Sequence, residues 1–235
     1  MKNIVTACLV LAACFLIVRT ADPADAFGTL ELLVDAADLD AMAGRTVHAN
    51  VNVSALAGKI NACQFYVGYD QAVLEPVSVV AGGAPWNLLL YNSWESAPVP
   101  GELSAASVVW PTGPVGTDQP GTVARLTFRV RDVSCTAATL HFLPNVDDTK
   151  ANLLSDLAYG VHVPAAVNSQ PIRIGLAGDA DGNGLVNIID LIFIRSRMGQ
   201  NVNTGNNRQA DVTNDGLINI LDLVAVRKHL NTRCN

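Results

Sequence analysis

The chain has 235 residues, of which 50% are hydrophobic and only 6% aromatic, and its formal net charge is −6. This length leaves room for one ordinary domain and one small domain. Lysine and arginine together number 15 and form no basic stripe, which argues against a nucleic-acid-binding surface. The many Val, Ile and Ala residues favour β-structure for the larger part of the chain.

Residues 1–26 have the pattern of a cleavable export signal. Lys2 provides the positive start, residues 4–18 form an apolar run, and residues 24–26 fit a small-x-small cleavage site before Phe27. The run is too short to span a bilayer comfortably. The alternative is a lipid anchor on Cys14, because the residues before it resemble a lipobox, although the apolar run continues beyond this cysteine. We expect a secreted protein.

Two segments with alternating apolar and polar side chains predict half-buried strands, at residues 46–53 and 124–131. Further strands are predicted at residues 62–69, 73–80, 104–110, 139–143 and 172–174. Turn signals rich in Gly and Pro occur between them, at residues 81–85 and 111–116. Many short strands with such turns predict an all-β sandwich, of jelly-roll or immunoglobulin-like type, over residues 27–175.

Residues 179–190 and 211–222, called here the first and second loops, share one twelve-residue pattern. Oxygen-bearing side chains stand at positions 1, 3, 5, 9 and 12, and glycine stands at position 6, as in an EF-hand calcium loop. Position 7 offers its backbone carbonyl, so its side chain is free to be apolar. The predicted ligands are Asp179, Asp181, Asn183, Leu185, Asn187 and Asp190 in the first loop and Asp211, Thr213, Asp215, Leu217, Asn219 and Asp222 in the second.

Two calcium ions are therefore expected, one in each loop. Position 12 is Asp instead of the usual, longer Glu, so each loop must close more tightly or bind the ion with different denticity. Thr213 is a neutral ligand, and we expect the second site to bind more weakly than the first. Clustered carboxylates repel without metal, so calcium binding is expected to contribute to the folding free energy.

Each loop precedes a segment with helical apolar spacing, at residues 188–198 and 220–230. The spacing predicts two helices with one apolar face each, buried against each other. Residues 175–178 form a short linker, so a small all-α domain is expected over residues 176–235. The apolar positions that match between the copies are Val186 with Ile218, Leu191 with Leu223, Ile194 with Val226, and Met198 with Leu230.

Three cysteines remain after removal of the predicted signal, namely Cys63, Cys135 and Cys234. Their spacing indicates neither a zinc site nor a redox centre. Two states stay open at this point. Cys63 can pair with Cys135, leaving Cys234 over, or all three can be thiols.

The last 60 residues resemble a dockerin, the two-repeat calcium module of cellulosomal proteins, through both loops and both following helices. The larger domain resembles a cohesin, the sandwich that dockerins bind. This second resemblance rests on residues 43–53, 65–70, 73–79 and 121–130. Together they imply a cohesin-bearing partner for the C-terminal domain and a dockerin-bearing partner for the sandwich.

The dockerin resemblance also implies partner-binding positions at the end of each loop and on the following helix. The near-symmetric repeat allows two binding orientations. Many dockerins carry Ser-Thr at the first pair of positions, whereas this chain has aliphatic residues, which favours a more apolar contact and a different partner specificity. The alternative is that these aliphatic residues complete the core of the helix pair. The implied positions are Ile188, Ile189, Arg195, Ser196, Ile220, Leu221, Arg227 and Lys228.

Signs of catalysis are lacking in the sequence. There is no Gly-x-Ser-x-Gly elbow, HExxH motif or phosphate loop. His48 lies on the polar face of a predicted strand, and His141, His162 and His229 have no evident partner. We therefore expect an exported, non-catalytic adaptor that assembles cohesin- and dockerin-bearing proteins, with a link to polysaccharide degradation.

Two further functional hypotheses remain. Residues 27–175 carry a net charge of −6, from 13 acidic and 7 basic side chains, whereas residues 176–235 are neutral, with 6 of each. Two calcium ions would bring the small domain to about +4, a contrast that permits self-association. The alternative function is a carbohydrate-binding sandwich delivered by a dockerin. Trp86 and Trp94 are its candidate sugar-stacking residues, although core or loop-anchoring roles are favoured for both.

Overall fold

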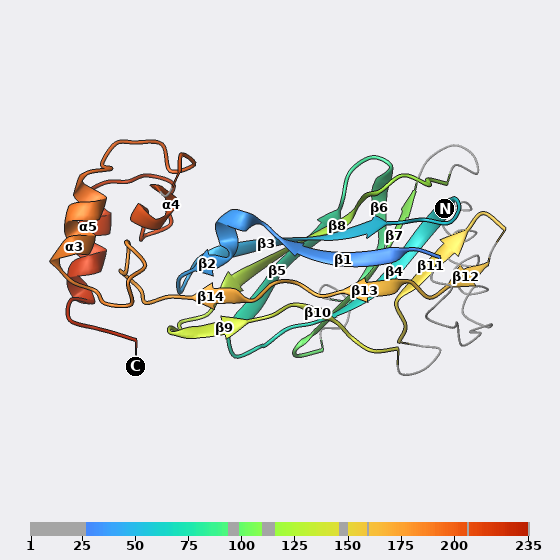
Figure 1. The fold of residues 1–235 in the computed structure, drawn as a ribbon, viewed down its shortest axis with the longest axis horizontal. Helices are drawn as coiled ribbons and strands as arrows, with labels where there is room; N and C mark the ends of the chain where they lie inside the picture. The colour runs from blue at the N-terminus through green and yellow to red at the C-terminus, as the bar shows by residue number, and fades with distance from the viewer. Residues whose placement is uncertain are drawn as a thin grey trace.

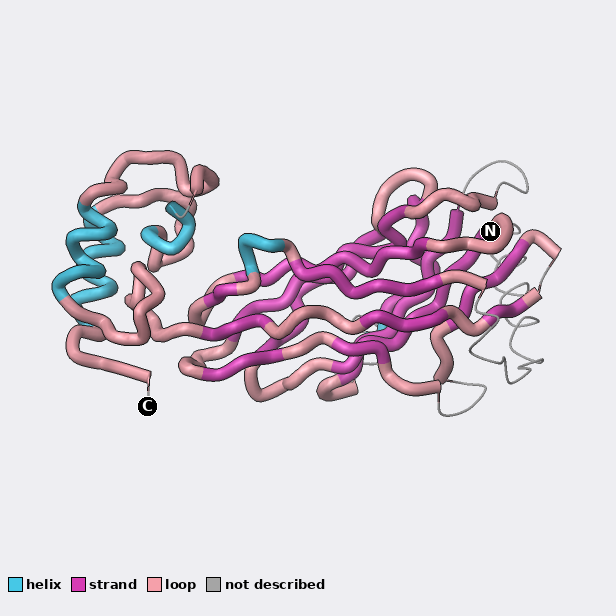
Figure 2. The backbone as a smooth tube through the Cα atoms, viewed as in Figure 1, coloured by secondary structure: helices cyan, strands magenta, loops and turns pink. Residues whose placement is uncertain are grey.

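The computed structural model describes residues 27–93, 99–109, 116–145, 150–158, 160–205 and 207–234. The predicted export signal, Cys14 and Trp94 lie outside these residues. The chain forms a long β-sandwich with a small helical module at one end (Figures 1 and 2). Among the described residues, no helix combines the length and apolarity needed to cross a membrane.

The sandwich contains two main sheets, with strand orders β13-β1-β3-β8-β5 and β12-β11-β4-β7-β6, and β10 pairs with β4. A small third sheet, β2-β14-β9, lies at the end nearest the helices (Figure 1). The strands are β1 (Thr29–Val34), β2 (Asp40–Ala41), β3 (Thr46–Ser54), β4 (Ile60–Gly68), β5 (Leu74–Ala81), β6 (Trp86–Asn92), β7 (Glu102–Val109), β8 (Gly121–Val130), β9 (Thr136–Ala138), β10 (His141–Phe142), β11 (Leu153–Asp156), β12 (Val161–His162), β13 (Ala165–Val167) and β14 (Ile172–Ile174).

The predicted alternation accounts for the core between the two main sheets. Every second residue of β3, from Val47 to Val53, is buried, and the same holds from Ala124 to Val130 in β8. These two strands pair antiparallel in the middle of one sheet. Trp86 is the largest fully buried side chain of the sandwich, which confirms the core role favoured for it.

The sequence patterns did not predict several of the strands, most notably β1, β6, β11 and β13. In β6 the pairing with β7 shifts register at two places. The consecutive Leu88, Leu89 and Leu90 are all only partly buried, so this strand has no period-two pattern to detect. The strands β11 and β13 are too short to show a pattern, since tertiary pairing stabilises them more than local preference does.

The helical module contains α3 (Ile188–Arg195), α4 (Asn207–Ala210) and α5 (Ile220–Lys228). The two predicted helices exist but end earlier than expected, and α4 was not foreseen. After α3 the chain turns through Gly199, whose φ of +75° suits glycine and whose N–H donates to the carbonyl of Ile218. Met198 is consequently 41% exposed, so the expectation that it belongs to the buried apolar face of the first helix was wrong.

The helical module has its own small core, separate from that of the sandwich. Val186, Ile194, Ile218 and Val226 are buried in it, as the repeat pairing predicted. The residues Leu176, Ala180 and Ala210 complete the buried set. Seven buried side chains make a small core, so additional sources of stability matter for this module.

The disulfide joins Cys135 to Cys234, with 5.4 Å between their Cα atoms. The proposed Cys63–Cys135 pair is therefore wrong, and so is the state with three thiols. Cys63 faces inward from β4 and is 1% exposed, so the sandwich core encloses it. Cys135 lies just before β9, at the end of the sandwich that meets the helical module. The disulfide thus connects the two modules covalently.

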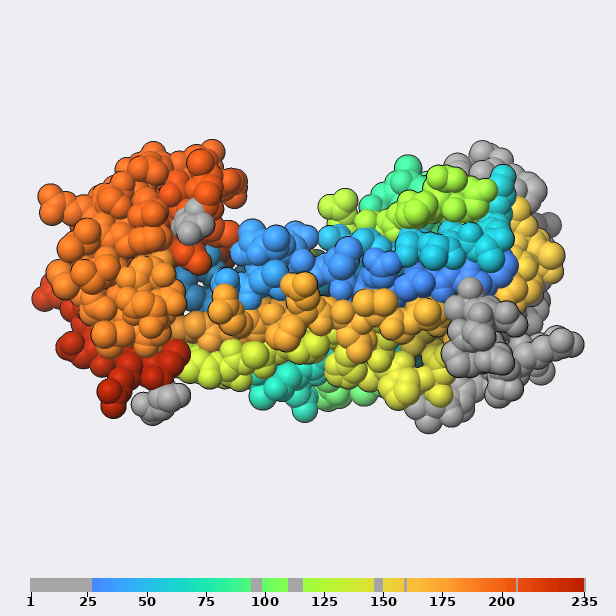
Figure 3. All heavy atoms as spheres, in the orientation of Figure 1, coloured from blue at the N-terminus to red at the C-terminus, as the bar shows by residue number. Residues whose placement is uncertain are grey.

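The helical module sits against one end of the sandwich, and Figure 3 shows it as a separate body there. Two charged contacts cross the boundary besides the disulfide. Arg45, in the turn before β3, donates to the carbonyls of Arg208 and Asp211. Arg208 in turn pairs with Asp38, in the short 3-10 helix η2 (Ala36–Asp38). The helices α3 and α5 lie on the side away from the sandwich (Figure 1).

Candidate functional site

The first loop brings its predicted carboxylates together. Oxygens of Asp179, Asp181 and Asp190 all lie within 4.8 Å of one another. Asp179 accepts from the backbone N–H of Asn183 at 3.0 Å and of Gly184 at 2.8 Å. Gly184, at position 6, has a φ of +83°, as the sharp turn requires. These hydrogen bonds from backbone N–H groups hold the loop in a curled shape, with its carboxylate oxygens facing a common centre.

The second loop repeats this arrangement with different residues at positions 3 and 5. Asp211 accepts from the N–H of Asp215 at 3.2 Å and of Gly216 at 3.0 Å, and Gly216 again has a φ of +83°. Thr213, which occupies the place of Asp181, donates its hydroxyl to Asp222 at 2.9 Å. The second loop therefore lacks the carboxylate at position 3 but has one at position 5, where Asp215 stands in place of Asn183. Its threonine hydroxyl is engaged with the position-12 carboxylate.

The position-12 carboxylates serve both the loop and the helix that follows. Asp190 is fully buried and accepts from the N–H groups of Asp181 and Asn187. Asn187 caps α3 by accepting from the N–H of Ile189 at 2.7 Å, which completes a capping box. Asn219 and Asp222 form the same capping box at α5. The position-9 asparagines, predicted as ligands, thus use their side-chain oxygens as helix caps.

The charge and burial of the loops suit a hard divalent cation. Asp179 and Asp190 in the first loop, like Asp211 and Asp222 in the second, are buried side chains. Burial raises the pKa of Asp179, and the neighbouring Asp190 and Asp181 raise it further. Buried carboxylates that repel one another need a counter-charge. The donors are all oxygens, which is the ligand type that calcium prefers.

Side chains at position 7 behave as predicted. Leu185 and Leu217 are 40% and 63% exposed, so neither contributes to a core. The carbonyl of Leu185 lies 3.3 Å from the side-chain nitrogen of Asn187, within the loop. Asn183 and Asp215, at position 5, accept from the N–H of the leucine two residues later. All twelve predicted ligand positions thus fall in two loops of matching shape.

A groove lies between α3 and α5, on the outer side of the helical module. Its volume is about 350 Å³. Ile188, Ile192, Ile220 and Val224 lie along it, and each is between 48% and 62% exposed. The prediction that each helix has one apolar face was therefore wrong, because both helices carry a second apolar strip that faces solvent. The complete lining is Ile188, Leu191, Ile192, Arg195, Ile220, Leu223, Val224 and Arg227, called here the helix groove.

The predicted partner-binding residues are all exposed, so the alternative that the aliphatic ones complete a core fails. Four of them line the helix groove, namely Ile188, Arg195, Ile220 and Arg227. The other four do not line the groove: Ile189, Leu221 and Lys228 lie on the same two helices, and Ser196 caps the end of α3. Sequence reasoning missed Ile192 and Val224, although their position four residues after Ile188 and Ile220 was a usable signal.

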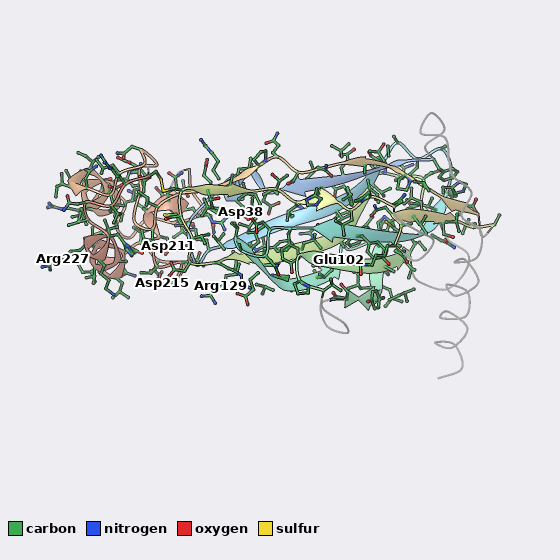
Figure 4. The ribbon with its side chains drawn as sticks, turned by 90° about the horizontal axis from the view of Figure 1, so that it is seen from below. Asp38, Glu102, Arg129, Asp211, Asp215 and Arg227 are labelled. Atoms are coloured by element: carbon green, nitrogen blue, oxygen red, sulfur yellow. A yellow bond between two sulfur atoms is a disulfide. The ribbon has the colours of Figure 1, made fainter. Side chains whose placement is uncertain are left out.

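Figure 4 shows on which side of the helical module a residue of the groove lies. Arg227, a lining residue, lies at the outer end of the molecule, whereas Asp211 lies on the side that faces the sandwich and Asp38. The second loop is therefore near the boundary between the modules, and the helix groove faces away from the sandwich.

Two of the histidines have carboxylate partners. His48 lies 2.8 Å from Asp38 through Nδ1, and His162 lies 3.0 Å from Asp156 through Nε2. The expectation that His162 lacks a partner was wrong, because the two residues meet across the β11–β12 pair. The two pairs lie at opposite ends of the sandwich, and Asp35 lies close to the first pair, with polar atoms of Asp35, Asp38 and His48 within 4.8 Å of one another.

Comparison with known families agrees with this architecture. Residues 32–158 match the model of the cohesin domain, and residues 177–231 match that of the dockerin type I domain. The first match spans more than half of the chain. No curated protein matches the chain.

Among solved structures, the cohesin module of a family 33 glycoside hydrolase from Clostridium perfringens is similar to 64% of this chain and 98% of its own, with 10% identity and a TM-score of 0.51. A type II cohesin domain from the cellulosome of Acetivibrio cellulolyticus has 22% identity, coverage of 62% and 93%, and a TM-score of 0.46. A non-cellulosomal cohesin from Archaeoglobus fulgidus has 16% identity, coverage of 63% and 91%, and a TM-score of 0.46. The first of these supports the sandwich fold.

Cohesins and dockerins are non-catalytic domains of cellulosome-type protein–protein assembly. The sandwich core, the twin oxygen-lined loops and both family matches lead to one conclusion: the chain belongs to the cohesin family and carries a type I dockerin domain after its cohesin domain.

Proposed function

We propose that this chain is a secreted adaptor with two binding ends. The sandwich receives a dockerin-bearing protein, and the C-terminal module binds a cohesin-bearing protein through the helix groove. The observation that carries the proposal is the exposure of Ile188, Ile192, Ile220 and Val224 in the complete chain. Exposed aliphatic residues gathered in one groove are typical of a protein-binding surface.

Calcium acts in this proposal by shaping the two helices. One ion in each loop neutralises the carboxylates that also cap α3 and α5, such as Asp190 and Asp222. The ligands are those predicted from the loop positions, with Asn187 and Asn219 holding the helix ends. The groove therefore depends on calcium, although no ion touches it.

Binding through the groove takes place between molecules. The chain's own sandwich contacts the opposite side of the C-terminal module, through the Cys135–Cys234 disulfide and Arg45. Self-association thus needs a second copy, whose acidic sandwich would meet a module made positive by calcium. Calcium-dependent oligomers in light scattering would support this, and a monomer at high concentration with calcium would exclude it.

Export and domain boundaries complete the proposal. We place the signal at residues 1–26, the sandwich at residues 27–175 and the dockerin at residues 176–235, since the two cores meet between Ile174 and Leu176. A cleavable signal suits calcium loops, because weak sites stay filled outside the cell. A role in polysaccharide degradation follows from the cellulosome-type domains and remains part of the proposal.

Glycan binding by the sandwich receives less support. Trp86, one of the two candidate sugar-stacking residues, is fully buried between the sheets and is not accessible to a ligand. Trp94 lies outside the described residues. Retention of the chain on cellulose would reopen this alternative.

A pull-down of the full chain tests the adaptor function. Immobilised cohesin modules and immobilised dockerin modules serve as two separate baits, each with calcium and with excess EGTA. We expect the chain to be retained by members of both sets, and retention on cohesin to be lost in EGTA. Failure to bind any member of either set in calcium would contradict the proposal.

A further inference from the structure

The C-terminal tail pairs with the first calcium loop. The N–H of Asn231 donates to Val186 at 2.8 Å, and the N–H of Val186 donates to Thr232 at 2.9 Å. The N–H of Cys234 donates to the carbonyl of Gly184, the position-6 glycine, at 3.0 Å. The tail thus forms a short strip along positions 6 to 8 of the first loop.

This strip is bound covalently to the sandwich. Cys234 forms its disulfide with Cys135, which lies 99 residues earlier in the turn before β9. The backbone hydrogen bond from Cys234 to Gly184 therefore connects the disulfide, and through it the sandwich, to the sharp turn at position 6 of the first loop. Movement of this loop away from its folded shape is opposed by the disulfide.

Arg45 makes the corresponding connection to the second loop. Its guanidinium donates to the carbonyl of Arg208, at the end of the short α4, and to the carbonyl of Asp211. Asp211 stands at position 1 of the loop, and its carboxylate accepts hydrogen bonds from the N–H groups of Asp215 and Gly216. Arg45 therefore holds the residue from which the second loop curls.

The position of Arg45 is itself well defined by the sandwich. Its N–H donates to Met42 at 3.1 Å, and its carbonyl accepts from Val130 at 2.7 Å, at the end of β8. The side chain is only 4% exposed. Burial lowers its pKa to about 10, and the charge of Asp211 opposes that change. A buried guanidinium needs hydrogen-bond acceptors, and the carbonyls of Arg208 and Asp211 provide them.

We propose that the end of the sandwich positions both calcium loops, with the Cys135–Cys234 disulfide acting on the first loop and Arg45 acting on the second. This inference rests on the proposed function, in that the loops must bind calcium. The three residues are positioning residues, since none of them offers a ligand atom. The sandwich would then be part of the calcium-binding unit as well as a receptor.

A reciprocal effect follows. If the contacts between the modules favour calcium binding, calcium binding must favour those contacts by the same free energy. The orientation of the helix groove relative to the sandwich is then set most firmly when calcium is bound.

Amide resonances of Gly184 and Gly216 can report the two loops separately. Each N–H donates to the position-1 carboxylate of its own loop, at 2.8 Å and 3.0 Å. We would titrate the full chain from Phe27 with calcium and compare it with two variants. Arg45→Lys keeps the charge but loses the planar group that reaches two carbonyls. The double variant Cys135→Ala with Cys234→Ala removes the covalent connection.

We expect Arg45→Lys to weaken calcium binding at Gly216 by about tenfold and to leave binding at Gly184 within about twofold. The disulfide variant should give the reverse pattern. Tenfold is the lower end of what groups holding metal ligands contribute to affinity. Arg129→Lys is the matched control, because Arg129 is exposed on β8, and it should change neither resonance.

Unchanged affinities at both loops in both folded variants would overturn the inference while leaving the calcium sites intact. Absence of any calcium response at Gly184 and Gly216 in the unaltered chain would instead overturn the proposed calcium sites, and the inference with them.

If a variant fails to fold, a measurement on the unaltered chain tests the inference in its place. Reciprocity predicts that saturating calcium shifts the equilibrium of the Cys135–Cys234 disulfide with a glutathione redox buffer toward the disulfide, by about tenfold for the coupling expected above. Equal dithiol–disulfide equilibrium constants with calcium and with EGTA would overturn the inference.

Discussion

Arg208 of the C-terminal module forms an ion pair with Asp38 of the sandwich, and only 2% of Asp38 is exposed. The other oxygen of Asp38 accepts from the N–H and from Nδ1 of His48, both at 2.8 Å. The buried carboxylate is thus shared between the two modules. Arg208 also reaches the carbonyl of Thr46, at 3.4 Å. The contacts of Arg208 thereby help to define the boundary between the two separate cores.

Replacement of Arg208 by Gln should destabilise the chain by about 2 kcal/mol, because it leaves a buried carboxylate with one partner fewer. A double-mutant cycle with Asp38→Asn should give a coupling free energy of about 1–3 kcal/mol in chemical unfolding. Additive effects of the two substitutions would show that the ion pair contributes nothing to the boundary.

Removal of calcium with EGTA should unfold α3 and α5 while the sandwich persists. Asp190 and Asp222 are fully buried at the starts of these helices, so their charges lose compensation. Circular dichroism at 222 nm should lose the helical signal and recover it on addition of calcium. Magnesium is the control cation, since it prefers a smaller octahedral site. A helical signal that is unaffected by EGTA would contradict the prediction.

Thr213→Asp should strengthen calcium binding at the second loop by about tenfold, because it supplies the carboxylate that the first loop has at Asp181. The same change should lower the stability of the calcium-free chain, since Thr213 now donates to Asp222 at 2.9 Å and an aspartate there would repel it. Calorimetric titration measures the first effect, and thermal melts in EGTA measure the second. An increase in both quantities would show that the hydroxyl contact is unimportant.

Ile192→Asp and Val224→Asp should each weaken binding to a cohesin partner by at least about tenfold, since buried anchors dominate protein interfaces. Both side chains are about half exposed, at 55% and 48%, so the free energy of unfolding should change by less than about 0.5 kcal/mol. Val80→Asp, at a side chain 51% exposed on β5, is the matched control. A loss confined to one of the two variants would indicate that the partner uses one helix alone.

Cys63 should be unreactive in the folded protein. Burial raises the pKa of its thiol far above the ordinary value, so the nucleophilic thiolate does not form near neutral pH. In a chain beginning at Phe27, iodoacetamide at pH 8 should label no cysteine when folded, one in denaturant, and three after reduction, as counted by mass spectrometry. Rapid labelling of the folded chain would contradict the burial of Cys63.

Much of the site was predictable because its information is local. The predicted ligands of each loop lie within twelve residues, and in the first loop the carboxylates of Asp179, Asp181 and Asp190 gather as their spacing predicts. The glycines at position 6 and the repeated helix caps follow the same local rule. The strands β3 and β8 were predictable for a similar reason, since alternation along one segment records which face is buried.

The helix groove was only partly predictable. Apolar residues at helical spacing occur on two sides of α3 and α5, and the pattern does not tell which side packs inward. Val186 and Ile194 were placed correctly in the core, whereas Ile192 and Met198 are exposed. The choice depends on how the two loops orient the helices.

The sequence by itself determined the two twelve-residue loops, the helices that follow them and the alternating strands of the sandwich, because each of these depends on neighbours within one segment. Only the tertiary structure decided that Cys135 pairs with Cys234 instead of Cys63, that Arg45 reaches Asp211 across 166 positions, and that the helix groove faces outward. Those contacts depend on how two separately packed cores meet, and no short-range pattern records that meeting.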